Sequence, residues 1–413
     1  MERFRYIGKK LFCENVDVAE IAEKVGTPFY LYSQKKIEEN YRALDTALKG
    51  IPHLICYSYK ANSNLTICRI LKTLGAGADI VSGGELYKAI KAGVAPEKII
   101  FAGVGKTEEE IRYAIKTGIL MFNVESVEEL NFINEIAGRM KRVVPVALRV
   151  NFGFDPHTHG YINTGKGSKF GIDISIARGV FAFAKVLKNV EVTGLHSHIG
   201  SQITEVEPFK KNLQMALKLA EDLKELKIKL RYINLGGGLG ISYRDTESPV
   251  PLSQLGRIYR QLLEGTHYTL ILEPGRFIAG NAGILVTRVL YTKESFHKKF
   301  VIVDAGMNDL IRPSLYNAFH RILPVEKSIN REVCKLNIVG PVCETGDFFA
   351  LDRTMSLPVK GDLLAVMEAG AYGFEMSSNY NSRCRVAQVL VKGRQFSIIK
   401  KRQEYSDLIR GEN

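Results

Sequence analysis

The sequence predicts an α/β protein that combines a (β/α)8 TIM barrel with a discontinuous all-β domain. Three observations lead to this fold class. The chain has 413 residues, more than one compact core usually accommodates. Short β-branched runs alternate with helical patterns over about 250 residues, the usual length of such a barrel. After Phe277 the helical patterns nearly disappear and short strand patterns take over.

The barrel region contains eight apolar runs, and segments with apolar residues at helical spacing lie between most of them. The longest of these helical segments are Glu108–Thr117, Val127–Met140 and Glu207–Leu226. An open, doubly wound sheet also fits the alternation, but it needs no eighth strand, so the barrel is favoured. The runs are His53–Lys60, Gly77–Ser82, Ile99–Gly103, Leu120–Val124, Val144–Asn151, Val190–His198, Leu230–Gly237 and Tyr268–Glu273.

The second domain is expected from both ends of the chain. Residues 4–12 alternate like a strand before a short helical pattern, Val16–Val25, and we expect them to join the C-terminal strands. One further helix is expected at Ser314–Arg321. The predicted domains are 1–30 and 278–413 for the β domain and 31–277 for the barrel. The C-terminal strands are expected at Ile284–Lys293, Lys299–Ala305, Lys335–Val339, Asp362–Met367 and Arg385–Lys401.

Composition narrows the class of protein. Hydrophobic residues make up 46% and charged residues 24%, as in an ordinary globular protein. No apolar run approaches the roughly 20 residues of a membrane span, and no signal peptide is visible. The six cysteines form no CxxC pair and are expected to be reduced thiols in a cytoplasmic protein. The net charge of +13 is spread along the chain, which favours anionic small substrates over nucleic acid.

Polar or glycine-rich groups follow seven of the eight runs. Because the C-terminal ends of barrel strands share one face, residues more than 200 positions apart are expected to surround one pocket. Strands generally end in something polar, but that does not account for the chemical variety of this set. The groups are Lys60, Asp79 with Ser82, Asn123, Arg149 with Asn151, His196 with His198, Gly236-Gly237-Gly238 and Glu273.

Lys60 and Glu273 are the most informative of these residues. A lysine that leaves a strand toward a barrel mouth is placed to form a Schiff base, because partial desolvation lowers the pKa of an amine. Taken alone, a lysine at a strand end is far more often a solvated surface charge, and only its companion residues favour the Schiff-base role. A carboxylate after an apolar strand needs a cationic partner. For Glu273 that partner is either a protonated ring nitrogen of a ligand or the nearby Arg276.

Two motifs allow competing interpretations. The glycines Gly236, Gly237 and Gly238 suit a phosphate site at a late barrel strand. A dinucleotide site is disfavoured, because its fingerprint follows the first strand of a βαβ unit. The pairs His196/His198 and His157/His159 are consistent with a metal, but a metal needs further ligands, and an imidazole that packs on a flat ring is the alternative. We predict no metal.

Together these motifs resemble the fold-type III pyridoxal-phosphate amino-acid decarboxylases, most closely the branch that converts meso-2,6-diaminopimelate to L-lysine and CO2 in the last step of lysine biosynthesis. The resemblance runs from Gly26-Thr27-Pro28 to Ala371-Tyr372-Gly373. The motifs between them are Tyr57–Asn62, Gly83–Leu86, His196–Gln202, Gly236–Gly238, Glu273–Arg276, Val342–Asp347 and Glu368–Gly373.

The resemblance implies pyridoxal 5'-phosphate as the cofactor and a role for each matched residue. Lys60 would carry the cofactor, Glu273 would contact the pyridine nitrogen and His198 would stack on the ring. Asp79 and Arg149 would support them. The phosphate would be held by Ser201, Gly236, Gly237, Gly238 and Tyr372, and Gly275 and Arg276 would also bind the cofactor.

The resemblance also implies the substrate contacts and the oligomer. Arg276, Arg312, Tyr316 and Tyr372 would bind the substrate, with the arginines on its distal carboxylate, since arginine pairs with carboxylates in bidentate fashion. Glu344 would bind its ammonium group. Cys343 would donate a proton from the partner subunit of a homodimer with shared active sites.

Other possibilities remain at this level. The same fold includes decarboxylases of ornithine, arginine or carboxynorspermidine. A cofactor-free Schiff-base aldolase, a nucleic-acid-binding protein and a metal hydrolase are rivals from other classes. The loop Phe152–Gly171 is either a lid that closes over the site or an ordinary surface loop.

Overall fold

The computed structural model describes residues 3–154 and 167–412 and divides into two compact units. One unit comprises residues 40–241 and 248–277, and the other comprises 1–39, 242–247 and 278–413. We call them the barrel unit and the β unit. Within the described residues, no helix combines the length and the apolar character that a membrane span requires.

The barrel unit contains a closed parallel barrel, as predicted. The strands pair in the order β9-β11-β12-β13-β5-β6-β7-β8, and β8 also pairs with β9, which closes the ring. All eight predicted runs supply a strand. The strands are β5 (His53–Ser58), β6 (Gly77–Ile80), β7 (Ile99–Phe101), β8 (Met121–Val124), β9 (Val144–Asn151), β11 (Val190–His196), β12 (Tyr232–Asn234) and β13 (Thr269–Leu272). The short strand β10 (Ile172–Asp173) pairs with the end of β9.

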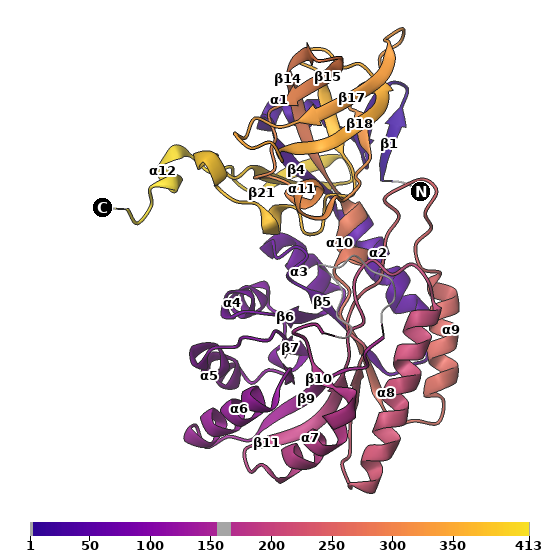
Figure 1. The fold of residues 1–413 in the computed structure, drawn as a ribbon, viewed down its shortest axis with the longest axis vertical. Helices are drawn as coiled ribbons and strands as arrows, with labels where there is room; N and C mark the ends of the chain where they lie inside the picture. Colours follow the sequence, from indigo (N-terminus) through magenta and orange to yellow (C-terminus); the bar gives the residue numbers. More distant parts are fainter. Residues whose placement is uncertain (1–2, 155–166, 413) are drawn as a thin grey trace. The chain divides into compact units, whose positions relative to one another are not determined.

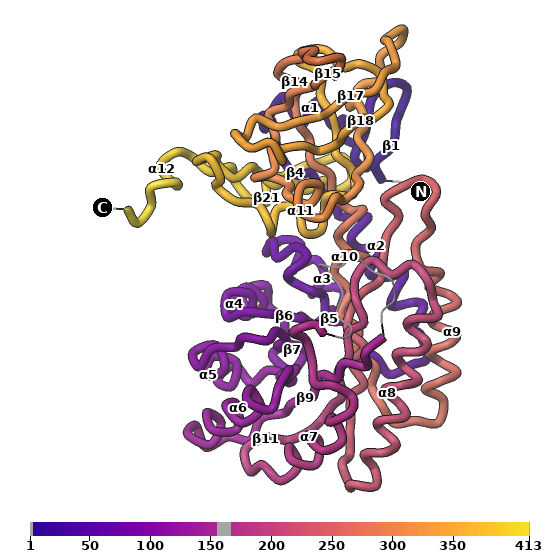
Figure 2. Tube along the Cα trace, in the orientation of Figure 1, coloured from indigo at the N-terminus to yellow at the C-terminus, as the bar shows by residue number. Residues whose placement is uncertain are grey.

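Helices cover the outside of the strands (Figures 1 and 2). Local sequence sets their ends: the Thr107 hydroxyl and Glu110 form a capping box, and Gly118 ends the same helix in the left-handed conformation. Ser82 also caps a helix, so its side chain serves the backbone. The helices are α2 (Gln34–Ala47), α3 (Leu65–Thr73), α4 (Gly83–Ala92), α5 (Glu108–Thr117), α6 (Val127–Arg139), α7 (Ile174–Val186), α8 (Glu207–Glu225) and α9 (Leu252–Leu263).

An apolar cluster fills one level of the barrel. It consists of Cys56, Ile100, Met121, Ala147 and Ile271, from five different strands. Because alternate residues of a strand share one face, the residue two positions further along lies on the same side. In four of these strands that residue is polar: Ser58, Asn123, Arg149 and Glu273. The strand period therefore places a polar layer next to the apolar one, toward the C-terminal ends of the strands.

The β unit is built from two sheets. Its N-terminal strands β1 (Phe4–Ile7), β2 (Lys10–Cys13) and β3 (Val16–Asp17) precede helix α1 (Val18–Val25). The larger sheet has the order β18-β17-β15-β14-β4-β20-β21, with β19 and β16 branching from β14. Its strands are β4 (Phe29–Ser33), β14 (Gly283–Ser295), β15 (Lys298–Val303), β16 (Ile322–Pro324), β17 (Val333–Val339), β18 (Phe348–Ser356), β19 (Leu363–Val366), β20 (Ala387–Lys392) and β21 (Gln395–Lys400).

Three details of this unit differ from the sequence-based expectation. Strand β4 spans residue 30 and pairs with β14 and β20, so the unit extends further along the chain than that residue. Strands β16 and β18 were not expected. The helix expected at 314–321 is only α11 (Arg312–Tyr316). It ends early because Asn317 adopts the left-handed conformation and its N–H bonds to the Arg312 carbonyl.

Candidate functional site

The polar layer of the barrel begins with Lys60, just after β5. Its ammonium donates to Asp79 Oδ2 at 2.6 Å, and the Ser58 hydroxyl donates to the same oxygen at 2.5 Å. The Asp79 side chain is fully buried, whereas that of Lys60 is 39% exposed. Burial, followed by the nearby charge of Glu273, raises the pKa of Asp79, and Lys60 and Ser58 oppose the rise. Asp79 thus orients the amine, and the Lys60 side chain is partly accessible.

Glu273 follows β13 and is held through one oxygen. Its Oε1 accepts from the amides of Asn234 at 2.7 Å and Asn123 at 3.0 Å, and His196 Nε2 lies 3.5 Å away. Burial alone would raise the pKa of Glu273, but His196, Lys60 and the Asn234 amide outweigh it, so the pKa lies below its usual range. Among the described residues, none bonds to Oε2. The ionised group therefore has an oxygen available for a cationic N–H.

His198 lies next to the glycine turn. Its Nδ1 accepts from the Gly237 N–H at 3.1 Å. Burial, and then the charges of Arg149 and Lys60, hold its pKa well below the usual range. The ring is therefore neutral, and its Nδ1 is fixed as an acceptor. A neutral, oriented imidazole can pack face to face against an aromatic ring.

The glycine turn is a close approach of backbone segments. A Cβ on Gly236 would lie 2.6 Å from His198 Nδ1, and a Cβ on Gly237 would lie 2.4 Å from the Glu273 carbonyl oxygen. Gly236 and Gly238 also have positive φ angles of 67° and 100°. Arg276 donates to the Ser201 hydroxyl at 3.1 Å, so a guanidinium and a hydroxyl lie together. Turns of this kind bind phosphate through backbone N–H groups.

Gly237→Ala is therefore expected to weaken phosphate binding at this turn, because the new methyl group must displace the Glu273 backbone. For pyridoxal phosphate, the cofactor that the sequence resemblance implies, the apparent Kd measured by titrating the cofactor-free protein should rise at least tenfold, which corresponds to about 1.4 kcal/mol. Gly179→Ala is the matched control, since a Cβ there meets nothing within 4 Å in helix α7. Equal Kd values for both variants would show that the turn does not hold the cofactor.

Arg149 is anchored away from solvent. It forms a buried ion pair with Glu125 at 2.7 Å, and its guanidinium lies 4.7 Å from the Phe170 ring centroid. Glu125 also accepts from the Gly171 N–H at 2.9 Å. The C-terminal end of the long loop is thereby attached to the barrel. The candidate lid residues His157, His159, Thr164 and Gly165 lie outside the described residues.

A second buried ion pair lies beside this layer. The Lys106 ammonium donates to Glu129 Oε1 at 2.5 Å and to the carbonyls of Gly103 and Asn123 at 2.8 Å each. Its three donors are thus all used. Glu129 in turn accepts from the Glu125 N–H at 2.8 Å. The pair therefore fixes the backbone of both Asn123, which contacts Glu273, and Glu125, which contacts Arg149.

Lys106→Met is expected to lower the free energy of unfolding by about 3–5 kcal/mol, because it leaves the Glu129 carboxylate buried without its cation. Urea denaturation measures the change. The double variant Lys106→Met/Glu129→Leu removes both charges and should regain much of the loss. A double variant as unstable as the single one would refute the ion-pair explanation.

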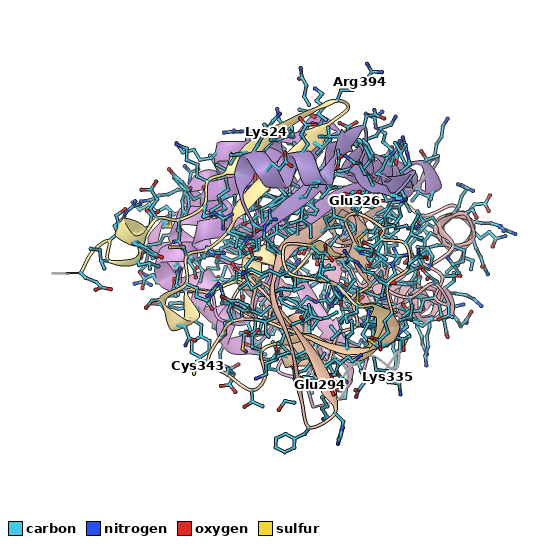
Figure 3. The ribbon with its side chains drawn as sticks, turned by 90° about the horizontal axis from the view of Figure 1, so that it is seen from above. Lys24, Glu294, Glu326, Lys335, Cys343 and Arg394 are labelled. Carbon is cyan, nitrogen blue, oxygen red and sulfur yellow. The ribbon has the colours of Figure 1, made fainter. Side chains whose placement is uncertain are left out.

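The β unit contains the remaining predicted residues. Arg312 is buried at the start of α11, and Tyr316 is half-buried at its end. Cys343 and Glu344 are exposed on the loop after β17, and Figure 3 shows Cys343 at the edge of this unit. The Ser314 hydroxyl donates to the Gly346 carbonyl at 2.5 Å, which ties α11 to this loop.

Asp347 and Tyr372 are further notable residues in the loops of the β unit. Asp347 accepts from the N–H groups of Met307 and Val342 at 2.6 and 2.7 Å, so it joins the segment before α11 to the Cys343 loop. Tyr372 has a φ of 56°, which is rare for a bulky residue and typical of strained functional positions.

Asp309 makes the stability of this unit pH-dependent. It is 1% exposed, and burial raises its pKa from 3.8 to about 7. The folded protein keeps the Asp309 proton up to a pH of about 7, whereas the unfolded chain loses it near pH 4. This difference stabilises the folded state fully below pH 4, and the stabilisation is lost as the pH rises through about 7. Stability should fall by up to about 4 kcal/mol over this interval. Asp309→Asn mimics the protonated acid, and its denaturation curves should lack this part of the pH dependence; an unchanged pH profile would contradict it.

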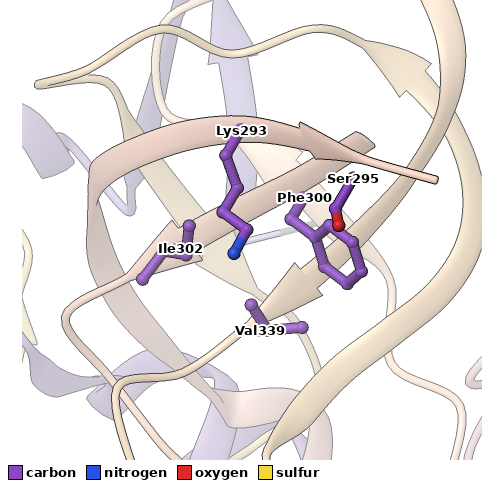
Figure 4. A pocket seen from close by; sticks show the side chains of 5 residues that line it. All are labelled: Lys293, Ser295, Phe300, Ile302 and Val339. Atoms are coloured by element: carbon purple, nitrogen blue, oxygen red, sulfur yellow. The ribbon is translucent and has the colours of Figure 1, made fainter. Parts of the chain in front are cut away.

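The β unit also has a hollow of about 240 Å³ between β14, β15 and β17. Its lining is Lys293, Ser295, Phe300, Ile302 and Val339, with the lysine as the one charged member (Figure 4). It lacks the paired acids and bases of the barrel. The barrel layer is therefore the stronger candidate site.

Comparison with known proteins agrees with this geometry. Residues 34–280 match the family model for the pyridoxal-binding domain of pyridoxal-dependent decarboxylases. This chain belongs to the pyridoxal-dependent decarboxylase family. Pyridoxal phosphate is accordingly the cofactor, and the amine, the ionised Glu273 and the glycine turn are the groups that such a molecule requires.

This decarboxylase is also similar to other proteins along its whole length. The chain is 49% identical to the diaminopimelate decarboxylase of Aquifex aeolicus over 98% of its length and 96% of the relative's. It is also 49% identical to the diaminopimelate decarboxylase of Pseudomonas aeruginosa, over 100% of this chain and 99% of that relative. The crystal structure of diaminopimelate decarboxylase from Helicobacter pylori with L-lysine has a TM-score of 0.91 and 42% identity, and covers 95% and 98% of the two chains.

Sequence reasoning missed several members of the site. Asn234, Glu125 and the Lys106–Glu129 pair were not singled out. The available signal was a polar residue inside an apolar run, as with Asn234 in Leu230–Gly237, because such a residue is buried only with partners.

Proposed function

We propose that this protein decarboxylates meso-2,6-diaminopimelate to L-lysine and CO2, the last step of lysine biosynthesis. The observation that carries the proposal is the barrel layer, in which Lys60, Glu273 and the glycine turn occur together in a chain that matches relatives of this name along its whole length. The lysine in the Helicobacter pylori structure has the chemistry of the product.

In this proposal the barrel residues bind and orient the cofactor. Lys60 would hold the cofactor, with its amine oriented by Asp79. Glu273 would contact the pyridine nitrogen, and His198 would pack on the ring. Arg149 supports this layer through its ion pair with Glu125. The phosphate would be held by Ser201, Gly236, Gly237, Gly238 and Tyr372, and Gly275 and Arg276 would also contact the cofactor.

The cofactor, when bound, supplies an electron sink for the pair of electrons that remains when CO2 leaves. The ionised Glu273 favours the protonated ring and so strengthens that sink. We assign Cys343 as the donor of the proton that replaces CO2. Its thiol is free and exposed, as a group that serves a neighbouring chain must be.

Substrate recognition is assigned to charged groups. Arg276 and Arg312, with Tyr316 and Tyr372, bind the substrate, and the guanidinium groups pair with the distal carboxylate. Glu344 pairs with the distal ammonium. The test is a side-by-side assay of CO2 release from diaminopimelate, ornithine, arginine and carboxynorspermidine. The kcat/KM of diaminopimelate should exceed that of each other substrate by at least about 100-fold, because the distal carboxylate adds two hydrogen bonds to a charged group. Preference for a substrate without the second carboxylate would refute the assignment.

We further propose a cytoplasmic homodimer in which Cys343 and Glu344 complete the partner's site. The described cysteines are all free, as expected of a reducing compartment. Lys60→Ala and Cys343→Ala chains, each inactive alone, should recover up to about a quarter of wild-type activity when they are mixed. Random pairing makes half of the dimers mixed, and each mixed dimer has one intact site out of two. No recovery after subunit exchange would exclude sharing.

A further inference from the structure

Two neutral side chains hold the Arg312 guanidinium. Arg312 is 6% exposed, and its Nη1 donates to the Tyr243 hydroxyl at 2.9 Å and to His320 Nε2 at 3.1 Å. The two rings meet edge to face, with centroids 5.4 Å apart. The guanidinium also lies 5.1 Å from the Tyr243 ring centroid. These contacts fix the direction of the Arg312 guanidinium.

The backbone fixes the tautomer of His320. Its Nδ1 lies 2.8 Å from the Met367 carbonyl, which only accepts, so Nδ1 carries the proton. Nε2 is then an acceptor, which suits a guanidinium that only donates. His320 is fully buried, and the Met367 N–H donates to the Arg321 carbonyl at 2.8 Å, so Met367, directly after β19, holds this segment through both its carbonyl and its N–H.

Charged neighbours of this pair are engaged elsewhere. Arg321 pairs with Glu368 at 2.5 Å and with Asp245 at 2.9 Å. The guanidinium groups of Arg244 and Arg353 lie 3.8 and 4.1 Å from the Phe319 ring centroid. Asp245, two residues after Tyr243, and Glu368, next to Met367, are thus bonded to Arg321, and Glu247 accepts from the Tyr243 backbone N–H at 3.0 Å.

We propose that Tyr243 and His320 are positioning residues that aim Arg312, and that they thereby set the preference for ligands with a carboxylate at that end. The inference rests on the proposed function, in which Arg312 binds the distal carboxylate. The two hydrogen bonds to Nη1 hold the guanidinium in one orientation, so less conformational freedom is lost when it pairs with an incoming carboxylate.

The experiment compares two ligands that differ by one carboxylate, L-lysine and cadaverine, as inhibitors of the holoenzyme. Tyr243→Phe and His320→Leu each remove one acceptor of the Nη1 hydrogen bonds. Each should raise the Ki of L-lysine and the KM of diaminopimelate about tenfold or more, the effect of one hydrogen bond to a charged group. The Ki of cadaverine, kcat and the cofactor Kd should change less than about threefold.

His320→Gln is the conservative variant, because its amide oxygen can replace Nε2 as acceptor, and it should retain lysine affinity that His320→Leu loses. If His320→Leu does not fold, Tyr243→Phe and His320→Gln still decide. Unchanged lysine affinity in Tyr243→Phe, or equal losses for lysine and cadaverine, would overturn the inference. Failure of Arg312→Ala to weaken lysine would instead refute the proposed role of Arg312.

Discussion

Replacing Lys60 with alanine is expected to abolish both the visible absorption of the bound cofactor and the release of CO2. The side chain is the exposed amine of the barrel layer, and its ammonium is oriented by Asp79 at 2.6 Å. Without it no covalent attachment forms, and the catalytic rate falls to background. Absorption spectra and a CO2 assay at saturating pyridoxal phosphate measure the two losses.

The control for this prediction is another lysine of the same unit. Lys116 is exposed in the last turn of α5, and Lys116→Ala should keep the absorption band and the activity. A Lys60→Ala protein that retained the band would mean that a different amine carries the cofactor, and the site would have to be sought elsewhere.

Replacing Glu273 with glutamine is expected to lower kcat by about 10²- to 10³-fold, the usual cost of removing one preorganised electrostatic contact. Glutamine keeps an oxygen for the amides of Asn123 and Asn234 but loses the negative charge that favours a protonated ring. The apparent Kd of the cofactor should rise much less than kcat falls. Steady-state kinetics at saturating cofactor separate the two effects.

Asn123→Ala is the matched control, because it removes one hydrogen bond to Oε1 and leaves the carboxylate in place. Its kcat should fall by about tenfold, the effect of one hydrogen bond to a charged group. If Glu273→Gln were no slower than Asn123→Ala, the charge of Glu273 would have no part in catalysis.

The barrel could be predicted because its signals are local. Each strand is a short apolar run, and the period of two places Ser58, Asn123, Arg149 and Glu273 on the same face as the apolar cluster. Strand-end residues that are far apart in the chain therefore meet once the barrel closes. The contacts of Lys60 with Asp79 and of His198 with Gly237 follow from that geometry.

The supporting contacts could not be predicted in the same way. Arg312 and Tyr243 are 69 residues apart, and their meeting depends on a segment between β12 and α9 that clusters with the β unit. The Lys106–Glu129 pair joins a loop to a helix, and no periodicity marks either residue. Helix α11 was expected to be longer, because the left-handed conformation of Asn317 has only a weak sequence signal.

The most direct test of the account is to reduce the purified holoprotein with borohydride and to map the modified peptide by mass spectrometry. The structure predicts the reduced cofactor on Lys60, within the peptide that follows β5. Reduced cofactor on another lysine would contradict the central claim that this amine and Glu273 act on the same cofactor. So would a borohydride-treated protein that carries no reduced cofactor and still releases CO2.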